Sequence, residues 1–196
     1  NSLTFCPAFG AVGFSIAEAT QEQIDVALAF CVKPFQALTE ALAPKIAIGF
    51  SSFYWLPACI AGYGAMAYAK RALEELAFNN PEQYKVIRAG FFRSPSSKAI
   101  ALLLYRTFKT NKHPMVVNLH DQWKASGEKL LDFFENHVLS QEATLLNQDF
   151  ETPHALTTSA SIERALNAVL QGSSEPFYNV IGDWEWETKD LPDIPV

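Results

Sequence analysis

Apolar side chains recur at helical spacing near the start of the chain. Thr20 and Gln23 have the spacing of a capping box, and an apolar stripe follows them. The stripe consists of Ile24, Leu28, Cys31, Phe35, Leu38 and Leu42. Pro34 removes an N–H from the helix interior, so it kinks or divides the helix, and Pro44 ends it. The pattern predicts a kinked helix between Thr20 and Pro44.

The longest stretch without a charged residue covers 46–69 and is long enough to cross a bilayer. Pro57 falls in its middle, with three glycines around it, and these residues disfavour one straight membrane-spanning helix. Because proline suits a helix N-terminus, we divide the stretch into a short apolar element over 46–55 and a helix over 57–78. We expect both to form protein core and not a stable membrane span.

The helix over 57–78 is expected to have a buried first half and a wet second half. Small side chains in the first half would let another backbone approach closely, which suits a central helix. The apolar stretch continues directly into charged residues that we expect in solvent, namely Lys70, Arg71, Glu74 and Glu75.

The rest of the chain is also mostly helical in pattern. A short helix is expected up to Arg88, a helix buried on all sides from Lys98 to Lys109, and amphipathic helices over 116–138 and 162–170. Residues 141–158 are less regular and predict a long loop with a turn of helix. The segments FYNVI and WEWET alternate around Gly182 and Asp183, which predicts a β-hairpin.

Taken together, these elements predict a mainly α fold. We expect a compact multi-helix domain of about six to seven helices over 1–174. A short C-terminal β-hairpin and an acidic tail over 175–196 would pack on this domain or extend from it.

The formal net charge of −6 is unevenly distributed. Most of the acidic excess lies in 175–196, whereas 83–120 contains seven basic residues and no acidic one. A basic middle could bind an acidic partner or nucleic acid, but pairing within the molecule is the simpler interpretation for an acidic protein. We therefore expect no nucleic-acid partner.

Cysteine usage bears on the compartment. The three cysteines, Cys6, Cys31 and Cys59, are odd in number and far apart, without a CxxC pair. This pattern argues against a disulfide framework or a zinc site, and the N-terminus lacks the basic start of a signal peptide. A cytoplasmic location is expected.

Motifs for catalysis or cofactor binding are absent from the sequence. Neither GxxxxGK[ST] nor GxGxxG occurs, and Ser51 and Ser52 follow Gly49 without a nucleophile elbow or an evident base. The four histidines are dispersed, and Cys31 and Cys59 lie in apolar runs that suppress thiol reactivity. We therefore predict that the chain is not an enzyme and holds no cofactor or metal.

Aromatic residues exceed what the predicted helix interiors need. They concentrate in two segments, which we take as candidate partner-binding surfaces: Phe50, Phe53, Tyr54 and Trp55, and then Phe91, Phe92 and Arg93. Exposed aromatic clusters are typical of interfaces, while the alternative is that these segments fold back over the domain core.

Three functions fit this sequence. The first is a non-catalytic adaptor or chaperone-like module that binds an amphipathic helix or a secreted substrate protein through an apolar surface. The second is a binding protein for an apolar small molecule or lipid. The third is a membrane-inserting protein that uses 46–69.

The pattern predicts an acidic, all-helical chain with a kinked first helix and no catalytic motif. In this overall character the protein resembles the LvgA-type adaptor subunits of the Dot/Icm type IVB secretion coupling complex. The resemblance covers the whole chain and rests on no diagnostic motif. It implies a place in a hetero-oligomeric complex, with binding to a helical segment of the coupling ATPase and to secreted effectors, and no catalysis.

Overall fold

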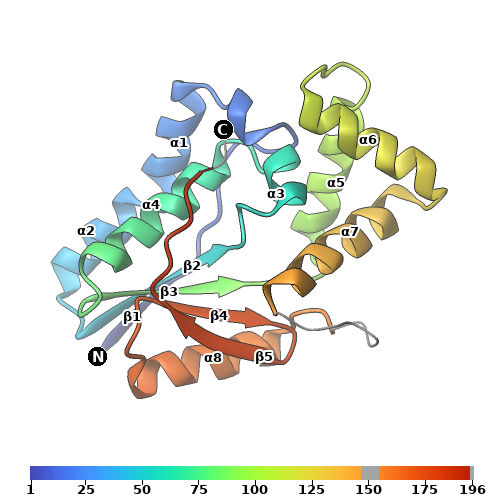
Figure 1. The fold of residues 1–196 in the computed structure, drawn as a ribbon. Coiled ribbons are helices and arrows are strands. Elements are labelled where there is room, and N and C mark those ends of the chain that lie inside the picture. The colour runs from blue at the N-terminus through green and yellow to red at the C-terminus, as the bar shows by residue number, and fades with distance from the viewer. Residues whose placement is uncertain (147–154, 195–196) are drawn as a thin grey trace.

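The computed structural model describes residues 1–146 and 155–194 and shows an α/β fold around one five-stranded sheet (Figure 1). The strands, which lie side by side in chain order, are β1 (Ser2–Phe5), β2 (Ile46–Ser52), β3 (Tyr84–Ala89), β4 (Phe177–Ile181) and β5 (Trp184–Thr188). The first four are parallel, and β5 is antiparallel to β4. The prediction of a mainly α, multi-helix domain is therefore wrong.

Helices connect the parallel strands. They are α1 (Gln21–Cys31), α2 (Lys33–Leu42), α3 (Pro57–Gly62), α4 (Met66–Asn79), α5 (Pro95–Thr107), α6 (Pro114–Ser126), α7 (Leu130–Leu145) and α8 (Ser159–Gly172), with a 3₁₀ turn, η1 (Ile16–Glu18). The helix predicted between Thr20 and Pro44 is divided just before Pro34, and Thr20 and Gln23 form the expected capping box.

The parallel strands β2 and β3 were not predicted as strands because they are buried on both faces. Ala47 and Ile48 are adjacent on β2 and point to opposite faces, yet both are fully buried; Val86 and Ile87 repeat this on β3. Strands of parallel sheets lack the alternation of apolar and polar residues that identifies a half-exposed strand. The short helix expected up to Arg88 is therefore wrong, because this segment forms β3.

Helices cover the sheet on both sides (Figure 1). On one face, side chains of α1, α2 and α4, such as Ala27, Phe35 and Leu73, pack with Ala47 and Val86 of the sheet. On the other face, side chains of α8 pack with β2, β3 and β4. The helices α3, α5, α6 and α7 form a lobe beyond the carboxyl ends of β2 and β3, with its own apolar cluster.

The two segments of the expected hairpin form β4 and β5, joined at Gly182. β4 also pairs in parallel with β3, so the hairpin completes the main sheet. After β5, residues 189–194 return across the sheet toward α4 (Figure 1). Of the loop expected over 141–158, α7 occupies the start as far as Leu145, and 147–154 lie outside the described residues.

The uncharged stretch 46–69 is divided among β2, α3 and the first turn of α4. Among the described residues, no helix is long and apolar enough to cross a membrane. The expected wet end of the helix over 57–78 is wrong for two residues, since Lys70 and Glu74 are 5% and 0% exposed. Both face polar groups at the carboxyl ends of the strands, as described next.

Candidate functional site

Polar side chains gather where β2 ends. In open parallel sheets, ligands bind beyond the carboxyl ends of the strands, because the loops there bring groups from several strands together. Ser51 is buried and Ser52 is partly exposed at this end of β2, between the ends of β1 and β3. The two serines are therefore in the part of the fold where a ligand is expected.

Ser52 is joined to a tyrosine from the helical segment that follows. Its hydroxyl donates a hydrogen bond to the hydroxyl of Tyr63, with 3.1 Å between the oxygens. Tyr63 ends α3 and lies among apolar side chains that include Ile60 and Ala67. Burial raises the pKa of Tyr63 to about 12, against the opposing effect of the Ser52 hydrogen bond. The phenol is therefore neutral near pH 7 and can donate its proton.

A buried lysine lies on the next helix. Lys70, in the second turn of α4, donates from Nζ to the backbone carbonyl of Phe50 at 2.8 Å. Burial lowers the pKa of Lys70, while nearby Cys31 and Glu74 oppose this effect. Tyr63 and Lys70 therefore both bond to the carboxyl-terminal half of β2, at Ser52 and at Phe50.

The junction of α3 and α4 is held by the loop after β1. Gly64 has a φ of 51°, and its N–H donates to the carbonyl of Phe14 at 3.1 Å. The next N–H, of Ala65, donates to the carbonyl of Ala11 at 2.9 Å. A side chain on Gly64 would collide with that Ala11 carbonyl and with the Phe14 ring, so only glycine fits. This junction fixes where Tyr63 points.

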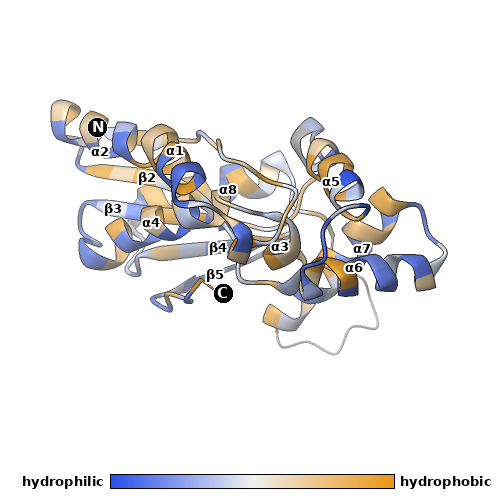
Figure 2. Cartoon of the chain, turned by 90° about the horizontal axis from the view of Figure 1, so that it is seen from above, coloured by the Kyte–Doolittle hydropathy of each residue, from blue (hydrophilic) through white to orange (hydrophobic). Residues whose placement is uncertain are grey.

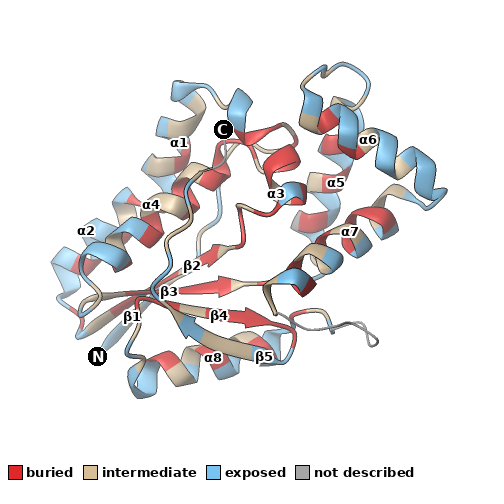
Figure 3. Ribbon diagram, in the orientation of Figure 1, coloured by how far each residue is buried: buried red, intermediate tan, exposed pale blue. Residues whose placement is uncertain are grey.

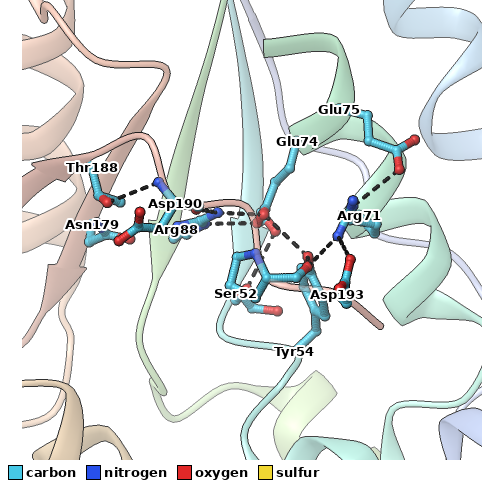
Figure 4. A network of polar contacts seen from close by, with 12 residues as sticks. Ser52, Tyr54, Arg71, Glu74, Glu75, Arg88, Asn179, Thr188, Asp190 and Asp193 are labelled. Carbon is cyan, nitrogen blue, oxygen red and sulfur yellow. Dashed lines mark hydrogen bonds and ion pairs between the residues drawn. The ribbon is translucent and has the colours of Figure 1, made fainter. Parts of the chain in front are cut away.

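Next to Lys70, a buried ion pair ties α4 to β3 (Figure 4). Arg88 donates from Nε and Nη2 to the two carboxylate oxygens of Glu74, at 3.0 and 2.7 Å. The Tyr54 hydroxyl donates to Glu74 at 3.3 Å and to the carbonyl of Pro192 at 2.9 Å. Both members of the ion pair are almost completely buried, so this cluster is a rigid support for the segment after Ser52.

The returning chain over 189–194 completes this support. Arg88 donates to the carbonyl of Asp190 at 2.8 Å, and Arg71 donates to the carbonyl of Pro192 and pairs with the exposed carboxylate of Asp193. Ile194 packs into the apolar cluster that holds Tyr54 and Tyr63. The C-terminal segment is thus part of the wall around the candidate site.

The chemistry available here is proton transfer by hydroxyl groups beside a lysine. In the part of the chain that the structure describes, no group of three or more histidine, cysteine or acidic side chains could hold a metal ion. Cys59, on α3, is unsuited to nucleophilic attack because burial, followed by Glu142, raises its pKa to about 12. Ser52, Tyr63 and Lys70 are the reactive groups that hydrogen bonds hold at the end of β2.

The structure separates the aromatic residues expected to form a binding surface. Phe53 and Tyr54 are buried core residues, and Phe50 and Trp55 are partly buried. Trp55 packs against both Phe53 and Tyr54. The segment folds back over the domain, because its rings fill the space between β2 and the helical lobe. An open aromatic groove is absent at this position.

The second expected surface is divided. Phe91 packs against Phe134 in the lobe, Phe92 is 48% exposed, and Arg93 pairs with Glu135 at 2.7 Å. Only Phe92 and Arg93 remain available to a partner. A role for these residues in partner binding stays a prediction.

Sequence reasoning overlooked Tyr63 and Lys70. Tyr63 lies inside the uncharged stretch, which predicts core, and Lys70 follows it directly, where the pattern predicts solvent. Ser52 was noticed but rejected for lack of a base. A signal was present, because Lys70 follows an apolar run in a helix with buried apolar residues on both sides, Ala69 and Leu73 among them. A lysine inside such a run is typical of a functional group.

Comparisons with known proteins add little. No family model matches the chain, and no curated protein matches it. Among solved structures, it is similar to an enoyl-[acyl-carrier-protein] reductase (NADH) from Aquifex aeolicus VF5, with a TM-score of 0.40 and 21% identity. The match covers 57% of this chain and 50% of that chain. The chain thus spans about half the length of the structure it matches.

The expectation of a non-catalytic chain is corrected at this point. The expectation rested on missing catalytic motifs, whereas the matched structure is that of an enzyme. The match assigns no reaction, which has to be argued from the side chains themselves. The resemblance to LvgA-type adaptors, on which none of these comparisons bears, stays a prediction.

Proposed function

We propose that this chain carries an acid–base site at the carboxyl end of β2, where Tyr63 transfers a proton to or from the oxygen of a carbonyl-type substrate. The observation that carries the proposal is the hydrogen bond of 3.1 Å between the hydroxyls of Ser52 and Tyr63, on a strand end and a helix junction next to buried Lys70.

Two hydroxyls side by side suit a developing negative charge on oxygen. When a base from the solvent removes the α-proton of a carbonyl compound, an enolate forms, and donors already in position stabilise the new charge on its oxygen. A neutral Tyr63 can give its proton to that oxygen, and Ser52 can then donate to the resulting phenolate. Positioned general acids of this kind typically contribute about 10²- to 10⁴-fold in rate.

Lys70 supports the same step. A protonated amine at the same end of β2 would favour a phenolate that proton transfer leaves there. The bond from Nζ to the Phe50 carbonyl fixes its position without cancelling its charge, since the partner is a neutral acceptor. Lys70 therefore acts through Tyr63 as a positioning residue.

The test is exchange of α-protons for deuterium in a panel of ketones and acyl thioesters, followed by NMR in D₂O. We expect the wild-type chain to accelerate exchange of at least one probe and Tyr63→Phe to lower that rate by about 10²- to 10⁴-fold without reaching the uncatalysed rate. Tyr68→Phe is the matched control, because Tyr68 is another partly buried tyrosine of the same apolar cluster. Equal rates for wild type and Tyr63→Phe, or no acceleration of any probe, would contradict the proposal.

A second candidate function, binding of an apolar small molecule, is favoured by an open cavity in the helical lobe. Its volume is about 250 Å³, and its lining is almost entirely apolar: Lys98, Ala101, Leu102, Tyr105, Trp123, Leu130 and Leu131. An apolar ligand seated there would change the fluorescence of Trp123, and Trp123→Phe would remove that response. An unchanged spectrum with every apolar probe would count against this function.

An adaptor role and a cytoplasmic location are also proposals. An adaptor role is compatible with the exposed Phe92 and Arg93, and a cytoplasmic location is supported by three free cysteines, Cys6, Cys31 and Cys59. Pull-down with Phe92→Ser as the comparison would test the first, and imaging of the tagged chain the second.

A further inference from the structure

The outer sides of α1 and α2 carry large apolar residues in solvent. Val26, Phe30, Leu38 and Leu42 are 41%, 56%, 40% and 58% exposed, and they follow one another at multiples of four residues. Pro34 occupies the remaining position of this row. Such a row forms a continuous ridge on a helix surface, here carried across the division between the two helices.

An aromatic pair enlarges the ridge. Phe9, in the loop after β1, is 52% exposed and packs against Phe30 with ring centroids 4.7 Å apart. The two rings therefore leave a joint apolar surface in water. Contiguous apolar surface of this kind marks an interaction site on most soluble proteins.

Small residues border the ridge. Ala29, Ala37 and Ala41 are exposed and also differ by multiples of four, with Lys33 at the missing position. They form a shallow row beside the larger side chains, so the same surface, which we call the α1–α2 face, presents both a ridge and a groove. Figure 2 shows apolar segments on both helices, and Figure 3 shows much of their outer surface exposed.

Charges at the two ends of the face differ in sign. Glu22 and Asp25 lie toward the start of α1, whereas Lys33 opens α2 and Lys45 follows it. Glu40 is the acidic residue on the lysine-bearing half. Within the described residues, neither lysine has an ion-pair partner, and both are exposed. An antiparallel arrangement would set the acidic end of one such face against the basic end of another.

We propose that the α1–α2 face binds a second copy of this chain across a twofold axis, with Phe30 of one copy packed against Leu38 of the other. A twofold interface requires a surface complementary to itself, which a ridge with an adjoining groove and opposite charges at its ends provides. The excess negative charge of the chain lies mainly in 175–196, outside this face. The inference is independent of the acid–base site.

Sedimentation velocity on the full chain over a range of concentrations tests this directly. We expect the wild type to dimerise, and Phe30→Asp or Leu38→Asp to weaken the dimer by more than about tenfold in Kd, because each would bury an unpaired carboxylate. Leu170→Asp is the matched control: this leucine is 44% exposed on α8, on the opposite side of the sheet, and this variant should dimerise like the wild type.

A charge variant tests the arrangement without touching an apolar residue. Lys33→Glu with Lys45→Glu makes the face uniformly acidic, so the dimer should weaken most at low salt, where screening is least. A wild type that stays monomeric at all concentrations would overturn the proposal. So would a dimer that tolerates Phe30→Asp, Leu38→Asp and the charge reversal alike.

Discussion

At the scale of single residues, environment decides what each polar group can do. Tyr63 is an ordinary phenol placed among apolar side chains, with one hydrogen bond to another hydroxyl. Lys70 is an ordinary amine inside a helix that faces the sheet. Their types were visible in the sequence, but their burial was not, because burial depends on which strands lie beside them.

The titration of Tyr63 follows from this environment. Its pKa of about 12 exceeds the ordinary value of 10, so folding favours the protonated phenol. Its contribution to stability is complete below pH 10 and is lost as pH rises toward 12. Ser52→Ala should raise the pKa further, since the hydrogen bond from Ser52 favours the phenolate.

Difference ultraviolet titration of the wild type against Tyr63→Phe measures this pKa, and the same comparison in the Ser52→Ala background measures the effect of the serine. A Tyr63 that titrates near 10 in the wild type would show that the phenol is in water and would remove the physical basis of the site.

At the scale of elements, local signals identified helix starts and the hairpin, whereas the parallel strands were missed. Thr20 caps its helix as the sequence indicates, and Gly182 makes the turn between β4 and β5. β1, β2 and β3 have no such signal, since their partners are remote in sequence, and the middle residues of β2 and β3 are apolar on both faces. The loops that join these strands to helices carry the site, so it was missed with them.

The α3–α4 junction offers a stability test at one of these loops. Gly64→Ala combines a left-handed φ with a collision against Ala11 and Phe14, so we expect a loss of at least about 2 kcal/mol in unfolding free energy. Gly127→Ala is the control, because Gly127 also has a positive φ of 70° but open space around it, and its cost should be only about 1–2 kcal/mol.

Chemical denaturation of both variants gives these values. Since the junction orients Tyr63, Gly64→Ala should also lower the rate of α-proton exchange in the substrate more than Gly127→Ala does. Equal losses of stability in the two variants would indicate that the junction is not tightly packed.

The ion pair between α4 and β3 allows a second test at this scale. Removing one partner, as in Arg88→Met, leaves the Glu74 carboxylate buried and unpaired, which typically costs about 3–5 kcal/mol. Arg164→Met removes an arginine that pairs with Asp183 and Glu185 at the surface, where the cost should be about 1 kcal/mol or less.

Urea denaturation near pH 7 measures both costs. Because Arg88 also holds the Asp190 carbonyl, limited proteolysis of Arg88→Met should cut the chain over 189–194 faster than in the wild type. Similar stability for Arg88→Met and Arg164→Met would mean that the buried pair does little for the fold.

At the scale of the whole molecule, one sheet brings together residues from distant parts of the chain. Ser52 ends β2, Lys70 lies on α4, and the Pro192 carbonyl accepts a hydrogen bond from Tyr54 at the C-terminal segment. The sequence alone supported a large apolar core and the kinked first helix. It did not support this convergence, because strand order and helix placement are set by packing over long sequence separations.

The most direct test of the acid–base site is a double-mutant cycle of Ser52→Ala and Tyr63→Phe on the rate of α-proton exchange in D₂O. If the two hydroxyls act as one unit, each substitution lowers the rate, and the double variant is no slower than Tyr63→Phe alone. A double variant slowed by the product of the two single effects would show that Ser52 and Tyr63 act separately and would contradict the account.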